Sequence, residues 1–237
     1  LGLIDVPSPE VQELISGAML HYNCENADFE NFSQVLDQIG ERYKELLQHL
    51  DWLSLGGGLY FTCDDYPLDK FIRKLKAFSE QFDLQLYLEP GEAAIRESTS
   101  LVTTVLDIVH NERDIAIVDS SIESHALDLL IYREQADIEG GSENGAFQYI
   151  VAGKSCLAGD VFGEYCTDVA LQPGDQIRFA DAGGYTMVKM NWFNGLKMPS
   201  IIIKRLDGSC DTVKTFSYQD FKQNFGTDAF ALNGGCG

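Results

Sequence analysis

The stretch WLSLGGG at residues 52–58 joins a short apolar run to three consecutive glycines. A brief apolar run that stops at a glycine turn is typical of a buried strand. Two similar runs flank it: ISGAMLHYN at 15–23 turns polar at its end, and LQLYL at 84–88 is followed by Glu89-Pro90-Gly91. We therefore predict three strands, each of which ends in a polar or glycine-rich segment.

Helical patterns fill the intervals between these three runs. Apolar residues recur every three to four positions across residues 29–50 and again across residues 67–82. That spacing places the apolar side chains on one face of a helix. The alternation of strand and helix predicts a parallel sheet or a (β/α) barrel for this part of the chain.

The pattern changes after about residue 97. Short β-rich runs follow at 101–107, 114–119, 147–153, 176–181, 185–190 and 200–206. Asp207-Gly208 is a hairpin-type turn after the last of them. We predict an antiparallel sheet or barrel here, with one helix near 122–132, an exposed loop at 138–146 and a frayed tail at 226–237.

The chain is strongly acidic. It has 237 residues, with 37 Asp and Glu against 17 Lys and Arg, which gives a net charge of −20. A surface of that sign repels nucleic acid and attracts cationic small molecules, although acidity also serves solubility alone. No run reaches the ~18 apolar residues that a membrane span needs. We therefore expect neither nucleic acid nor a membrane as a partner.

The cysteines and histidines form no recognisable metal site. The six cysteines include no CxxC pair, and the four histidines are scattered. No secretory signal is visible, so we expect reduced thiols and a cytoplasmic location. The first residue is Leu1, from which we expect this chain to be part of a longer one.

Three strand ends carry the first candidates for chemistry. In a barrel, functional groups gather at the carboxyl ends of the strands, where we expect His21, Gly56–Gly58 and Glu89 side by side. Bare glycine N–H groups can approach a phosphate, Glu89 could hold a protonated ring nitrogen, and His21 could stack on a flat cofactor. Singly, each has a plainer explanation: a tight turn, a solvated charge and a structural histidine.

The β-rich half supplies further candidates. Cys156 and Asp160 lie in the glycine-flanked loop GKSCLAGD at 153–160, and Tyr185 and Phe193 lie in GGYT at 183–186 and FNG at 193–195. Tyr185 offers a phenol to a phosphate oxygen. The alternatives are an inert cysteine and a tyrosine that packs on a strand.

These motifs resemble the fold-type III decarboxylases that depend on pyridoxal phosphate, an alanine-racemase-like group that includes the ornithine and diaminopimelate enzymes. The finer resemblance is to the carboxynorspermidine decarboxylase family and runs from about residue 10 to about residue 222. It rests on the segments HYNCEN at 21–26, LSLGGGLYFT at 53–62, LEPGEAA at 88–94, VDSSIESHALDLLIYRE at 118–134, GKSCLAGDVFG at 153–163 and YTMVKMNWFNGLKMP at 185–199.

The resemblance implies the fold and the cofactor. Residues 1–96 would be the C-terminal part of a pyridoxal-phosphate-binding (β/α)8 TIM-like barrel, and residues 97–225 a C-terminal β-barrel or sandwich domain. Glu89 would pair with the pyridinium nitrogen, so that the ring can act as an electron sink, and His21 would stack on the ring. The phosphate would be held by Gly56, Gly57, Gly58, Gly91 and Tyr185.

The resemblance also implies a shared active site. In this family the equivalent of Cys156 reaches the site of the partner subunit in a homodimer, where it can protonate the carbanion left by CO2. Asp160 would shape that loop on the substrate side, and Phe193 would line the site.

The segment at 88–94 departs from the commoner pattern of the group. Ornithine and diaminopimelate decarboxylases carry Arg after the EPG motif, whereas this chain has Glu92. We expect Glu92 and Asp128 to bind the amines of a cationic substrate and Arg133 to bind a carboxylate. For each of them, an ordinary surface charge is the alternative.

The expected reaction releases CO2 from carboxynorspermidine, and from carboxyspermidine, to give norspermidine or spermidine in polyamine biosynthesis. The Schiff-base lysine of the family belongs to an earlier strand than those matched here, and we expect no lysine of this chain to replace it. The chain by itself is therefore predicted to be inactive. A diaminopimelate-type decarboxylase, a non-catalytic homologue and an inactive fragment remain as alternatives.

Overall fold

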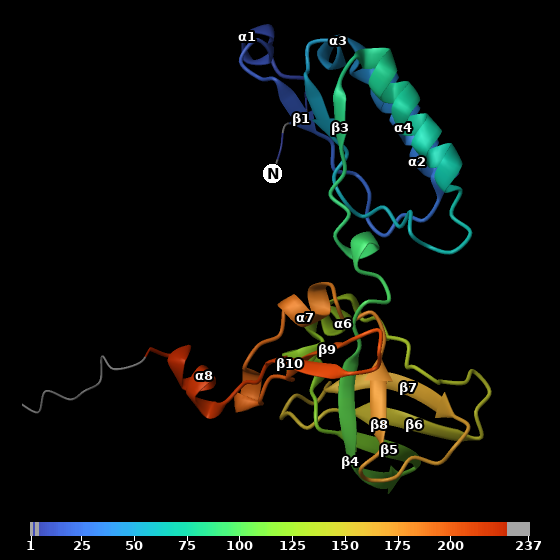
Figure 1. Ribbon diagram of the computed structural model, residues 1–237, viewed down its shortest axis with the longest axis vertical. Helices are drawn as coiled ribbons and strands as arrows, with labels where there is room; N and C mark the ends of the chain where they lie inside the picture. Colours follow the sequence, from blue (N-terminus) through green and yellow to red (C-terminus); the bar gives the residue numbers. More distant parts are fainter. Residues whose placement is uncertain (1, 3–4, 227–237) are drawn as a thin grey trace, which may run out of the picture. The chain divides into compact units, whose positions relative to one another are not determined.

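The computed structural model describes residue 2 and residues 5–226, so the predicted tail at 226–237 lies outside them except for its first residue. The chain divides into two compact units, Leu1–Arg96 and Glu97–Gly237 (Figure 1). Each unit has a buried apolar cluster composed only of its own residues. No helix among residues 5–226 is both long and apolar enough to cross a membrane.

The first unit is a three-stranded parallel sheet with helices. The strands β1 (Gly17–Met19), β2 (Trp52–Ser54) and β3 (Gln85–Tyr87) pair in that order. The main helices, α2 (Phe29–Arg42) and α4 (Leu68–Phe82), lie side by side along one face of the sheet (Figure 1). Short helices occur at α1 (Pro9–Gln12), α3 (Lys44–Leu47) and the 3-10 turn η1 (Glu92–Ala94). The predicted alternation of strand and helix is confirmed.

The caps explain where the two long helices begin and end. The side chain of Asp28 accepts hydrogen bonds from the N–H groups of Glu30 and Asn31, which begins α2. Asp83, in the left-handed conformation with φ 53°, ends α4. The single helix predicted over 29–50 is wrong in one respect, because Tyr43 leaves helical geometry and separates α2 from α3. The apolar spacing continues across this break because Leu47 and Leu50 face the same core.

The second unit contains a curled five-stranded sheet in the order β7-β6-β5-β4-β8. Its strands are β4 (Leu101–Asn111), β5 (Arg113–Val118), β6 (Phe147–Ala152), β7 (Val161–Thr167) and β8 (Gln176–Phe179). The predicted antiparallel pairing is present at β4–β5, β4–β8 and β6–β7, whereas β5 and β6 pair in parallel. Residues 138–146 form the predicted connection without helix or strand, apart from one isolated bridge at Ile138.

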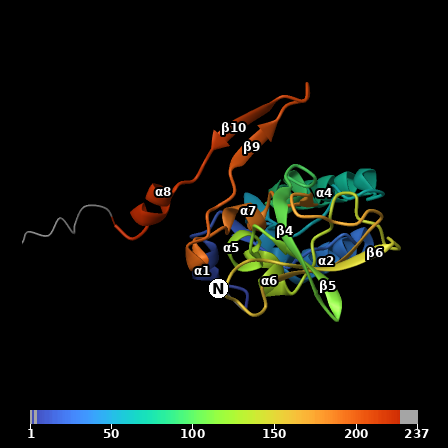
Figure 2. The ribbon, with the colours of Figure 1, turned by 90° about the horizontal axis from the view of Figure 1, so that it is seen from below.

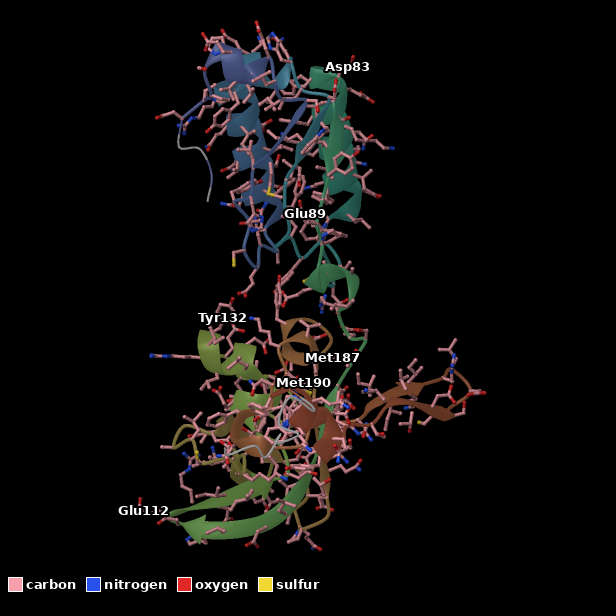
Figure 3. The ribbon with its side chains drawn as sticks, turned by 90° about the vertical axis from the view of Figure 1, so that its left-hand side faces the viewer. Asp83, Glu89, Glu112, Tyr132, Met187 and Met190 are labelled. Atoms are coloured by element: carbon pink, nitrogen blue, oxygen red, sulfur yellow. The ribbon has the colours of Figure 1, made fainter. Side chains whose placement is uncertain are left out.

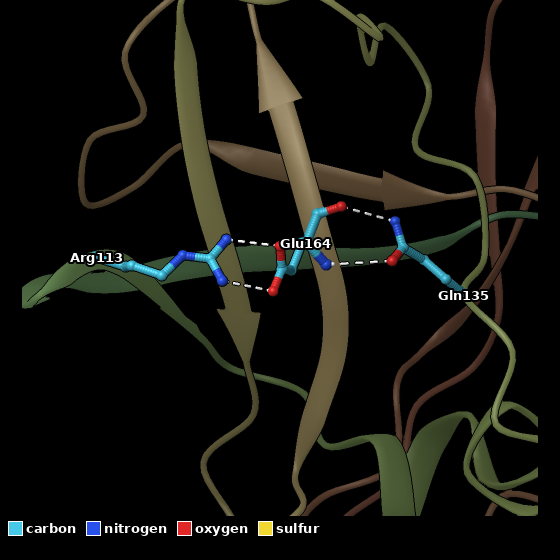
Figure 4. A network of polar contacts seen from close by, with 3 residues as sticks. All are labelled: Arg113, Gln135 and Glu164. Carbon is cyan, nitrogen blue, oxygen red and sulfur yellow. Dashed lines mark hydrogen bonds and ion pairs between the residues drawn. The ribbon is translucent and has the colours of Figure 1, made fainter.

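Polar contacts tie this sheet together across its width. The guanidinium of Arg113 on β5 binds both carboxylate oxygens of Glu164 on β7, at 2.5 and 2.6 Å, although β6 runs between these strands (Figure 4). The side chain of Gln135 donates to the Glu164 carbonyl at 2.8 Å and accepts from its N–H at 3.2 Å. The contact raises the pKa of Arg113 and lowers the pKa of Glu164.

Short helices and a hairpin complete the second unit. The helix predicted near 122–132 is two helices, α5 (Ile122–His125) and α6 (Leu127–Tyr132), which are separated at Ala126. The turn predicted at Asp207-Gly208 joins β9 (Ile201–Lys204) to β10 (Cys210–Lys214), and Figure 2 shows this hairpin extended away from the sheet. The 3-10 turn η2 (Phe193–Gly195) and helix α8 (Tyr218–Gln223) were not predicted.

The β-run predicted at 185–190 is wrong. Residues Tyr185–Val188 form a short helix, α7. Its Thr186 hydroxyl donates to the carboxylate of Asp128 on α6, and Met187 N–H donates to the Ala182 carbonyl. An apolar run this short does not distinguish helix from strand, and these tertiary bonds decide the outcome.

Candidate functional site

Three predicted site segments meet at one edge of the first sheet. His21, Gly56 and Glu89 each lie two residues beyond the last paired residue of a strand, and those three paired residues are in register across the sheet. The N–H of Glu89 donates to the Gly56 carbonyl at 2.9 Å. The expected grouping at the carboxyl ends of the parallel strands is therefore present in this unit.

The glycine turn leaves no room for side chains. A Cβ added at Gly56 would collide with the His21 ring, one at Gly57 would lie 2.5 Å from the Glu89 carbonyl oxygen, and one at Gly58 would collide with the Asn23 carbonyl. Gly56 and Gly58 also adopt φ of +70° and +74°, a region that favours glycine. The positive φ values of the turn thus explain Gly56 and Gly58. The close approach of neighbouring atoms requires glycine at all three positions.

The same turn offers unused hydrogen-bond donors. The N–H of Gly56 donates to Ser54 Oγ at 3.2 Å, whereas the N–H groups of Gly57 and Gly58 find no acceptor among the described residues. Neighbouring backbone N–H groups of this kind suit an anion.

Glu89 is held by a residue that sequence reasoning missed. Ser54 Oγ donates to Glu89 Oε1 at 2.7 Å, and Ser54 is buried at the end of β2. Glu89 itself is exposed at the end of its strand (Figure 3). The hydroxyl fixes one carboxylate oxygen, so that the other can accept a hydrogen bond from a ligand. A serine inside an apolar run was the available signal, but only sheet register shows its partner.

Two half-buried tyrosines pack against the core of this unit, and neither suits a role as a nucleophile. Burial raises the pKa of Tyr22, which follows His21, and raises the pKa of Tyr66 to about 12. Both phenols therefore stay protonated near neutral pH. Asn23 is also buried, and its Oδ1 accepts from Asn26 at 2.9 Å. These residues lie next to Gly58 in the fold. A Cβ added at Gly58 would collide with the Asn23 carbonyl.

This edge suits the two polar ends of pyridoxal phosphate. Free N–H groups in a side-chain-free turn fit a phosphate, and a fixed exposed carboxylate fits a protonated ring nitrogen. Gly91 and Glu92 follow Glu89 directly. The N–H of Gly91 donates to the Glu89 carbonyl at 2.9 Å, and the half-buried Glu92 accepts from Tyr60 at 2.8 Å.

The Cys156 loop of the second unit is held by Asp160. Cys156 is exposed, while Asp160 is 4% exposed. Asp160 Oδ1 accepts from Ile122 N–H at 2.7 Å and Oδ2 from Ser155 N–H at 2.8 Å. A Cβ at Gly153 would collide with the same carboxylate. This geometry gives Asp160 a loop-shaping role; its predicted contact with substrate stays a prediction.

Asp128 and Tyr185 lie close together in the second unit. Both Asp128 carboxylate oxygens are 2.9 Å from the hydroxyl of Thr186, the residue after Tyr185. The Lys189 ammonium lies 4.7 Å from the Tyr185 ring centroid and 5.5 Å from that of Tyr132. Figure 3 shows Tyr132 at the end of α6. Asp128 therefore fixes the helix that carries Tyr185.

Arg133 and Phe193 are less constrained. Arg133 is exposed and ends α6 in the left-handed conformation with φ 59°. Phe193, 38% exposed, accepts a hydrogen bond at its carbonyl from the Ser124 hydroxyl. Their roles toward substrate stay predictions, as do the proton-donor role of Cys156 and the phosphate contact of Tyr185.

The comparisons with known proteins point to one family. The family described as pyridoxal-dependent decarboxylase, C-terminal sheet domain, matches residues 19–183. A carboxynorspermidine/carboxyspermidine decarboxylase of Herminiimonas arsenicoxydans is 51% identical over 87% of this chain and 56% of its own length. A carboxyaminopropylagmatine decarboxylase of Synechocystis is 35% identical over 90% of this chain and 56% of its own.

A solved structure agrees with these sequences. The carboxynorspermidine decarboxylase of Campylobacter jejuni, complexed with norspermidine, superposes with a TM-score of 0.82 at 34% identity, over 89% of this chain and 60% of that one. The chain thus spans little more than half the length of the relatives it matches. With a family match over most of its length and the fold of a fold-type III enzyme, the chain belongs to the pyridoxal-dependent decarboxylases.

Proposed function

We propose that the protein containing this chain decarboxylates carboxynorspermidine and carboxyspermidine to norspermidine and spermidine, with pyridoxal phosphate as cofactor. One observation carries the proposal: His21, the glycine turn and Glu89 meet at a single edge of the parallel sheet, where Ser54 fixes the Glu89 carboxylate. This arrangement provides an anion cradle beside a ring-nitrogen acceptor.

The charge of the chain and its relatives support a polyamine substrate. The relatives at 51% and 35% identity are named for carboxylated polyamines. The net charge of −20 attracts a cation. Glu92, in the position after the EPG motif, can accept hydrogen bonds from an amine but cannot bind a distal carboxylate.

The residues of the first unit bind and orient the cofactor in this proposal. Bound pyridoxal phosphate supplies an electron sink for the pair left when CO2 departs. The N–H groups of Gly57 and Gly58 bind its phosphate, Glu89 accepts a hydrogen bond from the protonated ring nitrogen, and His21 packs on the ring. Ser54 keeps Glu89 in one rotamer, so its carboxylate need not reorganise during the reaction.

The second unit supplies the proton donor. We propose that the Cys156 thiol returns a proton to the substrate carbon in the site of a partner subunit, which makes the protein a homodimer. The exposed position of Cys156 on a loop held by Asp160 supports this role. We also propose a cytoplasmic location, which suits the five free thiols of the described residues.

Substrate turnover by the complete gene product tests the proposal. The protein is mixed with pyridoxal phosphate, and CO2 release is followed from carboxynorspermidine and carboxyspermidine beside diaminopimelate and ornithine. We expect a visible absorption band from bound cofactor and turnover of the two carboxylated polyamines. Turnover of diaminopimelate instead would overturn the substrate assignment. If neither the band nor turnover of any substrate is observed, the protein is not a decarboxylase that uses pyridoxal phosphate.

A further inference from the structure

The segment after the glycine turn is bonded to the turn after Glu89. Tyr60 Oη donates to Glu92 Oε2 at 2.8 Å, Thr62 Oγ1 donates to the Ala93 carbonyl at 2.8 Å, and the Arg96 guanidinium donates to the Thr62 carbonyl at 2.9 Å. The contacts of Thr62 and Arg96 each end on a backbone carbonyl. The contact from Tyr60 reaches a side-chain carboxylate.

Glu92 keeps one carboxylate oxygen available. Its Oε2 receives the Tyr60 hydroxyl, while Oε1 has no donor and the carboxylate has no Lys or Arg partner within residues 5–226. The side chain is half-buried. A negative charge in that position has lost part of its hydration without gaining a cation, which favours the binding of a cation from outside the chain.

The position of Tyr60 suits a fixed support. Its N–H donates to the Asn26 carbonyl at 2.9 Å, and it follows the glycine turn by two residues. A tyrosine has two side-chain torsions and a rigid ring, whereas a glutamate has three torsions whose freedom is lost when it binds a ligand. A hydroxyl bond that already limits the carboxylate lowers that entropic penalty.

We propose that Tyr60 is a positioning residue for substrate specificity: it fixes the Glu92 carboxylate so that Oε1 accepts a hydrogen bond from a charged amine of the substrate. The inference rests on the proposed function, in which Glu92 binds a polyamine. It adds a second residue to that contact and assigns it a measurable effect on amine binding, separate from cofactor binding.

The variant Tyr60→Phe tests this role in the complete gene product loaded with cofactor. It removes the hydroxyl and keeps the ring. We expect KM for carboxynorspermidine, and the Kd of norspermidine measured by calorimetry, to rise roughly tenfold, the effect of one hydrogen bond to a charged group. We expect kcat to change less than about twofold, since the contact is equal in ground and transition states. The Kd of pyridoxal phosphate should stay unchanged.

Two further variants separate positioning from simple loop support. Thr62→Val removes the bond to Ala93 but leaves Glu92 and Tyr60 intact, and we expect its norspermidine Kd to match the unchanged protein. In Glu92→Gln the norspermidine Kd rises, and adding Tyr60→Phe to it should change that Kd little, because both act through one contact. Thermal unfolding of each variant reports whether it is folded.

The outcomes distinguish a failure of the Tyr60 role from a failure of the proposed decarboxylase function. If Glu92→Gln weakens norspermidine binding but Tyr60→Phe does not, Tyr60 has no positioning role and the proposed function stands. If Tyr60→Phe and Thr62→Val weaken binding alike, the effect is loop support and the inference fails. If the unchanged protein neither binds norspermidine nor releases CO2 from the carboxylated polyamines, the proposed function fails and the inference with it.

Discussion

Burial keeps His125 neutral in the folded second unit. Its side chain is 2% exposed, and its Nδ1 accepts the Ser121 N–H at 3.1 Å. The ring proton therefore sits on Nε2. Loss of water around the ring is the main cause that lowers the pKa of His125 to about 4. Two neighbours, Asp119 and Asp160, favour the charged form but do not offset the burial.

We predict that this histidine makes the protein less stable in acid. The unfolded chain gains the His125 proton as pH falls through about 6.5, whereas the folded chain gains it only near pH 4. Between these values the unfolded state binds more protons, so the free energy of unfolding falls as pH falls, by about 3 kcal/mol over the whole window. Stability from this group is fully present above pH ~6.5.

Urea unfolding at about pH 7 and about pH 5 measures this effect. His125→Gln should lose less stability between the two pH values than the unchanged protein. His49→Gln, at an exposed histidine whose ring nitrogen contacts a backbone carbonyl, is the control for loss of a histidine outside the core. Equal pH dependence in the unchanged protein and His125→Gln would show that His125 does not titrate in this way.

Sequence reasoning found the residues whose role follows from their position at a strand end. His21, the glycine turn and Glu89 were predictable because parallel strands place their carboxyl ends together. Ser54 and Tyr60 were not, because each acts through a hydrogen bond to a residue more than thirty positions away. Such partners depend on sheet register, which a single apolar run does not encode.

At the scale of elements, hydrogen bonds to Asp160 hold the loop that contains Cys156 against the start of helix α5. Besides its two side-chain contacts, Asp160 bonds through its backbone, since its carbonyl accepts from Gly153 N–H at 2.8 Å and its N–H donates to Leu157 at 3.0 Å. Lys154 N–H donates to the Ser120 carbonyl at 3.1 Å. The carboxylate of Asp160 thus joins the loop to helix α5, and its backbone closes the loop that presents the thiol.

We predict that Asp160→Asn loosens this loop and destabilises the unit. An amide replaces one acceptor oxygen with a donor, so a buried backbone N–H loses its partner, which costs about 1–3 kcal/mol. The expected result is a lower free energy of unfolding in urea, together with a changed labelling rate of the Cys156 thiol by a disulfide reagent. Asp114→Asn, on the exposed start of β5, should change neither quantity. Unaltered stability and labelling in Asp160→Asn would contradict the role given to the carboxylate.

The short helices of this region show why element prediction failed where it did. The run at 185–190 contains aromatic and β-branched residues that favour a strand. Residues Tyr185–Val188 nevertheless form helix α7, in which the Thr186 hydroxyl donates a hydrogen bond to Asp128. The long amphipathic helices α2 and α4 were predictable because many residues share one periodicity. Segments of four to six residues carry too little pattern, and their tertiary bonds decide their conformation.

At the scale of the whole molecule, the two units differ in how completely they cover their own sheets. In the second unit, large side chains from several strands form one cluster, in which Phe162 and Phe179 stack at 4.5 Å between ring centroids. In the first unit, the row Ala18–Leu53–Leu86 packs toward the helices. On the opposite face Met19 and Tyr87 are each 53% exposed and Trp52 is 37% exposed, although Ser54, in register between Met19 and Tyr87, is buried. Parallel sheets are normally covered on both faces.

We predict that residues 97–226 fold as a separate polypeptide and that residues 5–96 do not reach a well-packed state alone. The second segment should unfold in one cooperative urea transition, because its core needs no residue from elsewhere. The first should bind anilinonaphthalene sulfonate, a dye for exposed apolar surface, and unfold broadly, since three-residue strands with one bare face bury little. Placing lysine at the bare face in Met19→Lys and Tyr87→Lys should reduce dye binding, whereas Glu41→Lys at an exposed position of α2 should not. A sharp transition without dye binding for residues 5–96 would show that the helices on one face suffice to stabilise this sheet.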